Sequence, residues 1–448
     1  MCGKSYMGSR NVTNHEGRIE MPEVSGAVID GNTEKPDFFG RIVFLGGIIP
    51  ESQSENIERN SKVGVQHAAD ALQKAILLGL SQHEGVTTSV VNLPFIGSYP
   101  RADRAAFVRE TTSHIYGRIR VLGAFFLNIA FLRGVSRYIS SLRCLRRELA
   151  GSSPCTIIVY SAHIPFLRAA IKLRRERPYV RLVLVLPDFI EHMAATSRRQ
   201  KFNNQRNARK FYGMLSQIDY YILLTAAMAD HLKLNTDRFS IVEGIDASLG
   251  EGDLSGSPDG KGPIFIYTGT LAKRYGILDL LDAFSKINIP SSQLWICGDG
   301  DARAAVEESA RADRRITYHG RVTRPAAIAL QARAHVAVNP RRPEGEFTKF
   351  SFPSKTIEYL ASGRPVVMHW LPGIPEEYRP YLIVPDTPDV AGLAASLKSV
   401  AERPLAELLV AGARGREFIQ KEKSPHAQIR KIMDKILGND ADIIGKKN

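Results

Sequence analysis

Residues 264–276 read IFIYTGTLAKRYG, a run of β-branched and aromatic residues followed by a glycine, a basic segment and a second glycine. A helical pattern of apolar residues begins at Ile277, so the stretch predicts a strand, a turn and a helix. Two similar turns follow later strands, GDGD at 298–301 and HGRV at 319–322. Glycine lets the backbone approach a ligand closely, and N–H groups at the start of a helix attract anions. Three such turns favour a binding site for a phosphate-bearing ligand.

The same alternation of strand and helix runs along almost the whole chain. Short β-branched runs bounded by Gly, Pro or Asp are separated by segments of helical length, which favours parallel sheets built from βαβ units. The predicted strands are residues 41–45, 87–93, 156–160, 181–186, 220–224, 240–242, 264–267, 293–297, 315–318, 335–339, 365–368 and 382–384. The sequence therefore predicts an α/β protein with two Rossmann-like, doubly wound domains across a cleft, where ligands bind beyond the carboxyl ends of the strands.

The domain boundaries follow from changes in composition. Residues 1–37 are polar and lack an apolar signal core, which predicts a flexible tail. Residues 246–263, DASLGEGDLSGSPDGKGP, have the Gly, Ser, Asp and Pro content of a linker. This divides the chain into a first domain at 38–245, a second at 264–425, and a C-terminal helix and tail at 426–448.

Charge and cysteine content narrow the function classes. With 60 Lys and Arg against 46 Asp and Glu, the formal net charge of +14 favours an anionic partner such as nucleic acid, acidic phospholipid or a phosphorylated substrate. The four cysteines form no CxxC pair, which indicates neither a zinc site nor a disulfide framework and suggests a reducing cytosol. No apolar run reaches the ~18 residues that a membrane-spanning helix requires. No HExxH or DxD spacing demands a metal, and we read 299–301 as a turn.

The segment 339–365, NPRRPEGEFTKFSFPSKTIEYLASGRP, contains the densest set of polar residues. Pro353 suits the first turn of a helix of about ten residues, and Gly363 suits its end. Lys355 and Glu358 stand three apart on one side of that helix. They are either a surface ion pair, or a ligand site in which Lys355 meets phosphate and Glu358 accepts ribose hydroxyl groups.

A resemblance to a known family bears on this choice. The region 267–377 resembles the donor-binding domain of family-4 retaining glycosyltransferases of the GT-B fold, through YTGTLAKRYGILDLLDAF, LWICGDGDA, ITYHGRV, VAVNPR, EFTKFSFPSKTIEYLASGRPVV and GIPEEY. The first half continues it through IVFLGGIIP, HAADALQKAILLGL, VYSAHIPFLRAA and VLPDF. The bacterial capsular and exopolysaccharide branch is the most similar. The order of these segments is preserved over roughly 390 residues.

The resemblance implies roles for individual residues. Glu358 resembles the family glutamate that holds the nucleotide ribose, and Lys273 and Lys355 resemble the basic residues at the donor diphosphate. The remaining donor-binding candidates lie on the glycine loop of the first domain, on the three turns and at the start of the helix: Gly46, Gly47, Gly269, Thr270, Arg274, Gly298, Asp299, Gly300, Gly320, Arg321, Val322 and Ser354.

The chain departs from the family pattern at three places. The two family glutamates enclose seven residues, and the first of these positions is Phe350 here, which leaves Glu346 as the candidate for its sugar-contacting role. Thr270 stands where an arginine is frequent, and Tyr275 where a lysine is frequent. We therefore expect the diphosphate contacts to be shifted onto Arg274 or Lys355.

Two candidates lie in the first domain, and a third feature concerns the membrane. His163 and Asp188 each follow a strand, so either residue can lie at the cleft and position the acceptor or accept its proton. In the alternative, His163 is a structural histidine and Asp188 caps a helix. The arginine-rich segment 101–147 surrounds the apolar stretch 121–132. This is either a basic amphipathic patch for an anionic membrane surface or a solvated face over an ordinary core.

The resemblance implies an enzyme that transfers a sugar from a nucleotide-sugar donor to a saccharide or lipid-linked acceptor with retention of configuration, in exopolysaccharide, capsule or lipopolysaccharide synthesis. Lys273, Lys355, Glu346 and Asp188 are the catalytic candidates. We expect no cofactor and no metal, no nucleic-acid partner, and a cytoplasmic location with peripheral attachment to the inner face of the plasma membrane as a hypothesis. The alternatives are a nucleotide-sugar epimerase of GT-B fold and a non-catalytic nucleotide-sugar-binding subunit. A nicotinamide oxidoreductase is disfavoured because no GxGxxG follows the first strand.

Overall fold

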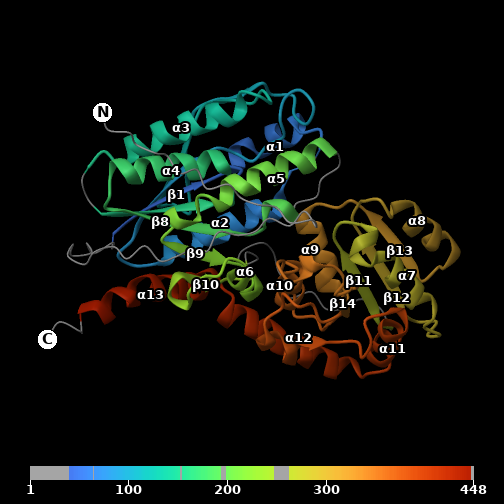
Figure 1. Ribbon diagram of the computed structural model, residues 1–448. Coiled ribbons are helices and arrows are strands. Elements are labelled where there is room, and N and C mark those ends of the chain that lie inside the picture. Colours follow the sequence, from blue (N-terminus) through green and yellow to red (C-terminus); the bar gives the residue numbers. More distant parts are fainter. Residues whose placement is uncertain (1–39, 64, 152–153, 193–197, 247–261, 445–448) are drawn as a thin grey trace, which may run out of the picture.

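The computed structural model describes residues 40–63, 65–151, 154–192, 198–246 and 262–444, which form two lobes (Figure 1). The N-lobe comprises residues 40–246, and the C-lobe comprises residues 262–424. The predicted tail and nearly all of the predicted linker lie outside the described residues.

A mixed sheet of eight strands forms the centre of the N-lobe, in the order β10-β9-β8-β7-β1-β2-β5-β4. All neighbours are parallel except β4 and β5, and β3 and β6 form a separate antiparallel pair. The strands are β1 (Arg41–Gly46), β2 (Thr87–Asn92), β3 (Phe107–Val108), β4 (Thr111–Ile115), β5 (Ile119–Gly123), β6 (Phe126–Leu127), β7 (Cys155–Tyr160), β8 (Val180–Leu186), β9 (Tyr220–Leu223) and β10 (Phe239–Ile241). Apart from Thr156 and Arg181, strands β7 and β8 are apolar, as expected for parallel strands covered on both faces.

Helices cover both faces of this sheet. One face packs on α3 (Arg133–Glu148), α4 (Ile164–Glu176), α5 (Arg198–Tyr212) and α6 (Ala226–His231). The other packs on α2 (His67–Gln82) and on the last helix of the chain, α13 (Pro425–Ile444). The short helix α1 (Glu51–Asn60) follows β1.

The C-lobe is built on a fully parallel sheet in the order β13-β12-β11-β14-β15-β16. Its strands are β11 (Ile264–Thr268), β12 (Gln293–Cys297), β13 (Ile316–Gly320), β14 (Val336–Asn339), β15 (Val366–Met368) and β16 (Leu382–Ile383). Its helices are α7 (Ile277–Ser285), α8 (Arg303–Ala312), α9 (Arg324–Arg333), α10 (Lys355–Ala361), α11 (Val390–Ala401) and α12 (Leu405–Glu422). The two core clusters of this lobe lie on opposite sides of the sheet.

All twelve predicted strands are present, with ends within two residues of the prediction. The predictions missed β3 to β6, which are short or polar and lie in the arginine-rich segment 101–147. Part of the apolar stretch 121–132 belongs to an ordinary core, as one of the two alternatives held: β5 and β6 bury Val121, Leu122 and Phe126 in the N-lobe core. Its exposed large apolar residues are Phe125 in the middle and Phe131 and Leu132 at the end. Within the described ranges, no helix has both the length and the apolar character needed to span a bilayer.

The last helix returns to the N-lobe, which sequence patterns alone did not predict. Figure 1 shows α13 in red along the N-lobe, and its residues Ile429, Ile432, Met433 and Ile436 are buried against the N-lobe sheet and α2. The two helices cross closely at Gly79, where a Cβ atom would lie 2.4 Å from the Pro425 carbonyl oxygen. Glycine is therefore required at this crossing.

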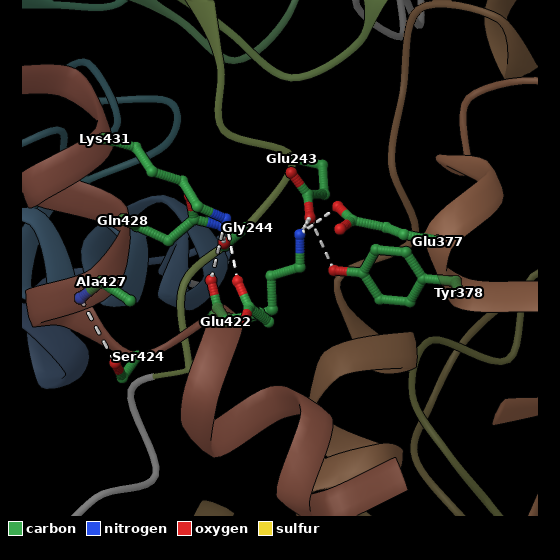
Figure 2. A network of polar contacts seen from close by, with 10 residues as sticks. Glu243, Gly244, Glu377, Tyr378, Glu422, Ser424, Ala427, Gln428 and Lys431 are labelled. Atoms are coloured by element: carbon green, nitrogen blue, oxygen red, sulfur yellow. Dashed lines mark hydrogen bonds and ion pairs between the residues drawn. The ribbon is translucent and has the colours of Figure 1, made fainter. Parts of the chain in front are cut away.

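A buried ion pair lies where α12 leads into α13. The Lys423 ammonium is 2.5 Å from a carboxylate oxygen of Glu243, just after β10, and 2.5 Å from one of Glu377. The Tyr378 hydroxyl donates to Glu243 at 2.7 Å, and Figure 2 shows Glu243, Glu377 and Tyr378 converging there. Side chains of Lys423 and Glu243 are only 1% and 3% exposed, so neither charge is compensated by water.

Replacing Lys423 by methionine removes the charge while it keeps an unbranched side chain, and it leaves the Glu243 carboxylate buried without its cation. Breaking a buried pair from one side costs about 3–5 kcal/mol, so the free energy of unfolding in urea should fall by roughly that amount.

The matched control is Lys421→Met, two residues earlier on an exposed side of the same helix, which should change stability by less than about 0.5 kcal/mol. Adding Glu243→Gln to Lys423→Met should recover part of the loss. An unchanged urea midpoint for Lys423→Met alone would show that the pair contributes no stability.

Candidate active site

The candidate residues of the C-lobe lie at the carboxyl edge of its sheet, around Glu358 on α10. The Lys355 ammonium is 2.6 Å from Glu358 Oε1. Gln331 of α9 donates its Nε2 to the same oxygen at 2.6 Å and to Thr268 Oγ1, at the end of β11, at 2.8 Å. Among the described residues none donates to Oε2 of Glu358, although the side chain keeps 21% exposure. One carboxylate oxygen is therefore held by the protein and the other is free to accept.

Electrostatics keep Glu358 ionised. Burial by itself would raise the pKa of this carboxyl, but the charge of Lys355 and hydrogen bonds from Lys355 and Gln331 outweigh burial and lower the pKa below its ordinary value. A carboxylate that stays charged and accepts hydroxyl hydrogen bonds fits the chemistry predicted for the ribose of a nucleotide.

The helix that carries this pair differs from the prediction. α10 spans seven residues from Lys355, so Pro353 lies before the helix and not in its first turn, and the exposed Ser354 is its N-cap. Gly363, in the left-handed conformation with φ +72°, follows the helix end as predicted. The residues between the end of β14 and Lys355 form a loop that contains a 3-10 helix, so the α-helix begins only after them.

The glycines at the turns have clear packing roles. A Cβ atom on Gly298 would lie 1.8 Å from the Gly269 carbonyl oxygen, and one on Gly300 would lie 2.4 Å from the Leu271 carbonyl oxygen. Leu271 N donates to Asp299 O at 2.9 Å, so the turns after β11 and β12 are bonded backbone to backbone. The glycine pattern thus fixes two adjacent loops at one edge of the sheet.

The basic candidates of the C-lobe lie on these loops. Lys273 begins the short 3-10 helix η4 (Lys273–Tyr275), its backbone N–H donates to Asp301 at 2.9 Å, and its side chain is exposed. The Arg274 guanidinium lies 5.0 Å from the Tyr275 ring centroid. Thr270 and Arg321 are exposed, and Val322 is half-buried.

A further arginine was missed by the sequence prediction. Arg341, directly after β14, is 9% exposed and lies 4.7 Å from the Phe347 ring and 5.6 Å from the Tyr275 ring. Its Nη2 donates to Ser351 at 2.9 Å. The only sequence signal was the segment VAVNPR, and nothing there separated Arg341 from its neighbour Arg342, which pairs with Asp279.

The N-lobe contributes Asp188, which follows β8 and lies in the electrostatic field of Arg341 across the two lobes. Its side chain keeps contact with solvent, but the surrounding protein raises its pKa to about 6, with Arg341 acting in the opposite direction. The lobes also touch beside this point: the Phe189 and Phe350 rings are 5.3 Å apart, and Thr225 Oγ1 donates to the Lys349 carbonyl at 2.8 Å. A carboxyl that titrates near neutral pH suits proton transfer.

His163 occupies an aromatic cluster. Its ring lies 4.2 Å from the Phe166 ring and 5.6 Å from the Phe95 ring. Burial, with a smaller effect of Arg137 and Arg133, lowers its pKa well below the ordinary value, so the imidazole is neutral. This environment favours the structural alternative for His163.

The glycine loop of the N-lobe is held from α2. Gln73, fully buried, accepts from Gly47 N at 2.8 Å, and Asp70 accepts from Ile49 N at 2.7 Å. A Cβ atom on Gly46 or Gly47 would lie within 2.7 Å of neighbouring atoms. Sequence analysis named the glycines but not the two side chains that position the loop.

Glu346, the candidate for contact with the transferred sugar, makes no polar contact with the Glu358 cluster. It begins the 3-10 helix η5 (Glu346–Thr348) after Gly345, which has φ +86°, and it is exposed. No hydrogen bond or ion pair joins it to Lys355 or Glu358. Within the described part of the chain, no three His, Cys, Asp or Glu side chains lie together as metal ligands would.

Comparisons with known proteins agree with this architecture. Residues 262–403 match the family model described as glycosyl transferases group 1, whereas no curated protein matches the chain by sequence. Among solved structures, sucrose-phosphate synthase from Thermosynechococcus elongatus superposes with a TM-score of 0.60 at 15% identity, covering 89% of this chain and 100% of that chain. The catalytic domain of starch synthase IV from Arabidopsis thaliana, bound to ADP and acarbose, gives 0.60 at 9% identity, covering 90% and 99%.

A third solved structure, Anabaena Alr3699/HepE in complex with UDP and glucose, gives a TM-score of 0.54 at 14% identity, covering 88% of this chain and 99% of that chain. At such low identity these likenesses concern the fold. They confirm the predicted fold class of two Rossmann-like domains. The chain has the GT-B glycosyltransferase fold and carries a group 1 glycosyltransferase domain at residues 262–403.

Proposed function

We propose that this protein transfers a sugar from a nucleotide-diphosphate sugar to a saccharide or lipid-linked acceptor, with retention of the anomeric configuration. The observation that carries the proposal is the Glu358 cluster: an ionised carboxylate with one oxygen held by Lys355 and Gln331 and the other available. It lies in the group 1 domain, at the sheet edge where ligands of open α/β sheets bind. ADP in the starch synthase and UDP in Alr3699/HepE support a nucleotide as the ligand.

In the proposed reaction, Glu358 accepts hydrogen bonds from the ribose hydroxyl groups, and the cations of the C-lobe stabilise the departing diphosphate. Lys355, Lys273, Arg274 and the nearly buried Arg341 supply positive charge on loops of one sheet edge. Charge that is fixed before the reaction stabilises a developing anion without reorganisation. We therefore propose that the chain's own cations suffice and that no metal takes part.

Acceptor chemistry is assigned to the N-lobe. The bond from the anomeric carbon to the diphosphate breaks, the acceptor oxygen bonds to that carbon, and the acceptor hydroxyl proton is lost. We propose Asp188 as the group that positions this hydroxyl or receives its proton, because it lies near Arg341 and its pKa is raised to about 6. Glu346 is proposed only as a contact to the transferred sugar from the loop before α10. His163, neutral within its aromatic cluster, is proposed as a structural residue and not as a base.

A role in exopolysaccharide, capsule or lipopolysaccharide synthesis in bacteria, in the cytoplasm and at the inner face of the plasma membrane, is supported by the family resemblance and by the +14 charge. A nucleotide-sugar epimerase or a binding subunit would use the same donor site. Incubation with a nucleotide sugar, with and without acceptor, separates the three: transfer gives a new glycoside, epimerisation gives an isomeric nucleotide sugar, and a binding subunit gives neither.

Glu358→Gln should weaken nucleotide binding while it keeps the shape of the side chain. Loss of two charge-assisted hydrogen bonds costs about 1.5–3 kcal/mol, so the dissociation constant should rise roughly 10- to 150-fold. The measurement is thermal stabilisation by UDP, GDP, dTDP and CDP and their sugars, since ligand at 100 times its dissociation constant adds about 2.7 kcal/mol of stability.

Glu376→Gln, at an exposed carboxylate paired only with Arg379, is the matched control and should respond to nucleotide as the wild type does. Equal stabilisation of Glu358→Gln and wild type would remove Glu358 from the donor site. Stabilisation by NAD or duplex DNA alone would overturn the glycosyltransferase proposal.

The raised pKa of Asp188 predicts two pH effects. Between the ordinary value of 3.8 and about 6, the folded protein holds the Asp188 proton more tightly than the unfolded chain does, so stability falls as pH rises through this window. The unfolding free energy of Asp188→Asn relative to wild type should therefore increase from acidic to neutral pH. If ionised Asp188 takes the acceptor proton, kcat/KM of the wild type should decline below pH about 6, and the variant should lose roughly 100-fold or more of its activity together with that decline.

Asp230→Asn, at an exposed position on α6, is the control and should keep the wild-type pH profile. An unchanged acidic limb in Asp188→Asn would exclude Asp188 as the titrating group.

A further inference from the structure

Exposed apolar side chains are concentrated in one part of the N-lobe. Fourteen large apolar residues are exposed among the described residues, and eight of them lie between Tyr99 and Ile139. Scattered exposed apolar residues are ordinary, whereas a concentration of this kind marks an interaction surface. We call six of them the apolar ridge: Phe107, Phe125, Phe131, Leu132, Val135 and Ile139.

The members of the apolar ridge are neighbours in space. The Phe107 and Phe125 rings are 6.3 Å apart, and they flank the paired strands β3 and β6. Ser140 of α3 donates to the Phe125 carbonyl, and Ser136 Oγ accepts from Leu127 N at 2.9 Å, so the first half of α3 lies along β6. Val135 and Ile139 stand one helical turn apart on α3. The ridge is therefore one continuous surface.

The side of α3 that faces the protein is firmly anchored. Arg137 is fully buried, donates to the carbonyl oxygens of Leu93 and Pro94, and stacks 4.2 Å above the Phe126 ring. Leu142 and Leu145 pack in the N-lobe core. The exposed side chains are thus presented by a rigid helix, and they cannot be buried by a rotation of α3 without exposing Arg137.

Arginines border the apolar ridge and carry charge of one sign. Residues 99–147 contain ten arginines and two acidic residues. The exposed stripe of α3 continues from Ile139 to Arg143 and Arg147, and the Arg109 guanidinium lies 6.0 Å from the Phe107 ring. Of the two acids, Asp103 is buried and Glu110 pairs with Arg147. Arg120 and Arg146 also pair with acids, Glu148 and Glu176, and the remaining excess of arginines makes the border positive.

This charge distribution selects among partners. A second copy of the chain bound through the same surface would place two arginine borders against each other, because a two-fold interface is self-complementary. Three further exposed apolar side chains, Leu405, Leu409 and Val410 on α12, lie beside exposed residues of both signs, Glu407 and Arg414. Aromatic and aliphatic residues surrounded by arginines match a partner that has an apolar interior under an anionic outer layer.

We propose that the apolar ridge and its arginine border dock this protein on an anionic phospholipid bilayer, with the ridge inserted at the level of the headgroups. Phe125 follows the carboxyl end of β5, on the same edge of the N-lobe sheet as the glycine loop and His163. Docking therefore brings the acceptor side of the cleft toward the membrane. Delivery of a lipid-linked acceptor from that membrane rests on the proposed function, whereas the docking itself does not.

The test is co-sedimentation of the full chain with vesicles of phosphatidylcholine alone and of equal parts phosphatidylcholine and phosphatidylglycerol. The wild type should bind the anionic vesicles and be released at high salt, since charge attraction is screened. Phe131→Ser/Val135→Ser/Ile139→Ser should lower the partition coefficient at least tenfold. Arg143→Gln/Arg147→Gln should lower it by roughly fivefold for each charge.

Leu405→Ser/Val410→Ser, at exposed apolar positions on α12, is the matched control and should bind the vesicles as the wild type does. Urea unfolding and stabilisation by nucleotide, measured on every variant, report the fold and the donor site separately. Nucleotide stabilisation with no vesicle binding by the wild type would overturn the docking proposal alone. Equal binding of the ridge variant and the wild type, or a self-association that the ridge variant abolishes, would also overturn it. Vesicle binding without any nucleotide effect would leave docking standing and contradict the proposed function.

Discussion

The ion pair between Lys423 and Glu243 is the interaction on which the arrangement of the two lobes depends. The chain leaves the N-lobe just beyond Glu243 and returns to it just beyond Lys423, and Asp246 N donates to the Lys423 carbonyl at 2.8 Å. Both crossings therefore meet at one point. Two desolvated charges stabilise a structure only when they are closely paired and hydrogen-bonded, and Tyr378 and Glu377 complete that pairing here. A displacement of one lobe that separates the pair leaves a buried charge without a partner.

The rest of the molecule is organised around this junction. α12 packs on the C-lobe sheet and α13 packs on the N-lobe sheet. The two helices are joined at Lys423, so consecutive segments of the chain complete the cores of both lobes. With the lobes placed in this way, the carboxyl edges of both sheets contribute to one site. Asp188 from one sheet and Arg341 from the other influence each other's ionisation for that reason.

The two carboxylates of the site have opposite environments. Glu358 receives a lysine and an amide and keeps its charge, whereas Asp188 is exposed at the surface but has neighbours that raise its pKa to about 6. In the proposed function, this division gives the charged Glu358 a role in binding and the titrating Asp188 a role in proton transfer. The arginines of the N-lobe are divided in a similar way: Arg137 is a buried structural group, while Arg143 and Arg147 remain at the surface.

Sequence alone determined the class of fold, all twelve principal strands and the Lys355–Glu358 pair, because these depend on periodicity, turn residues and spacing within about ten residues. It named Gly298 and Gly300 as donor-site candidates, and the structure shows that both are needed for close contact with the neighbouring loop. It gave no signal for Gln331, Arg341 or the return of α13. It also missed the strands β3 to β6 in the segment 101–147, which it left open between a basic membrane patch and a solvated face over an ordinary core. Tertiary structure decided these features because each depends on a contact between segments far apart in the chain, such as Gln331 with Thr268 and Glu358, or Lys423 with Glu243. Local sequence patterns determine the backbone conformation. The partner of a polar side chain is determined only in the folded protein, where the sheets bring distant loops to the same edge.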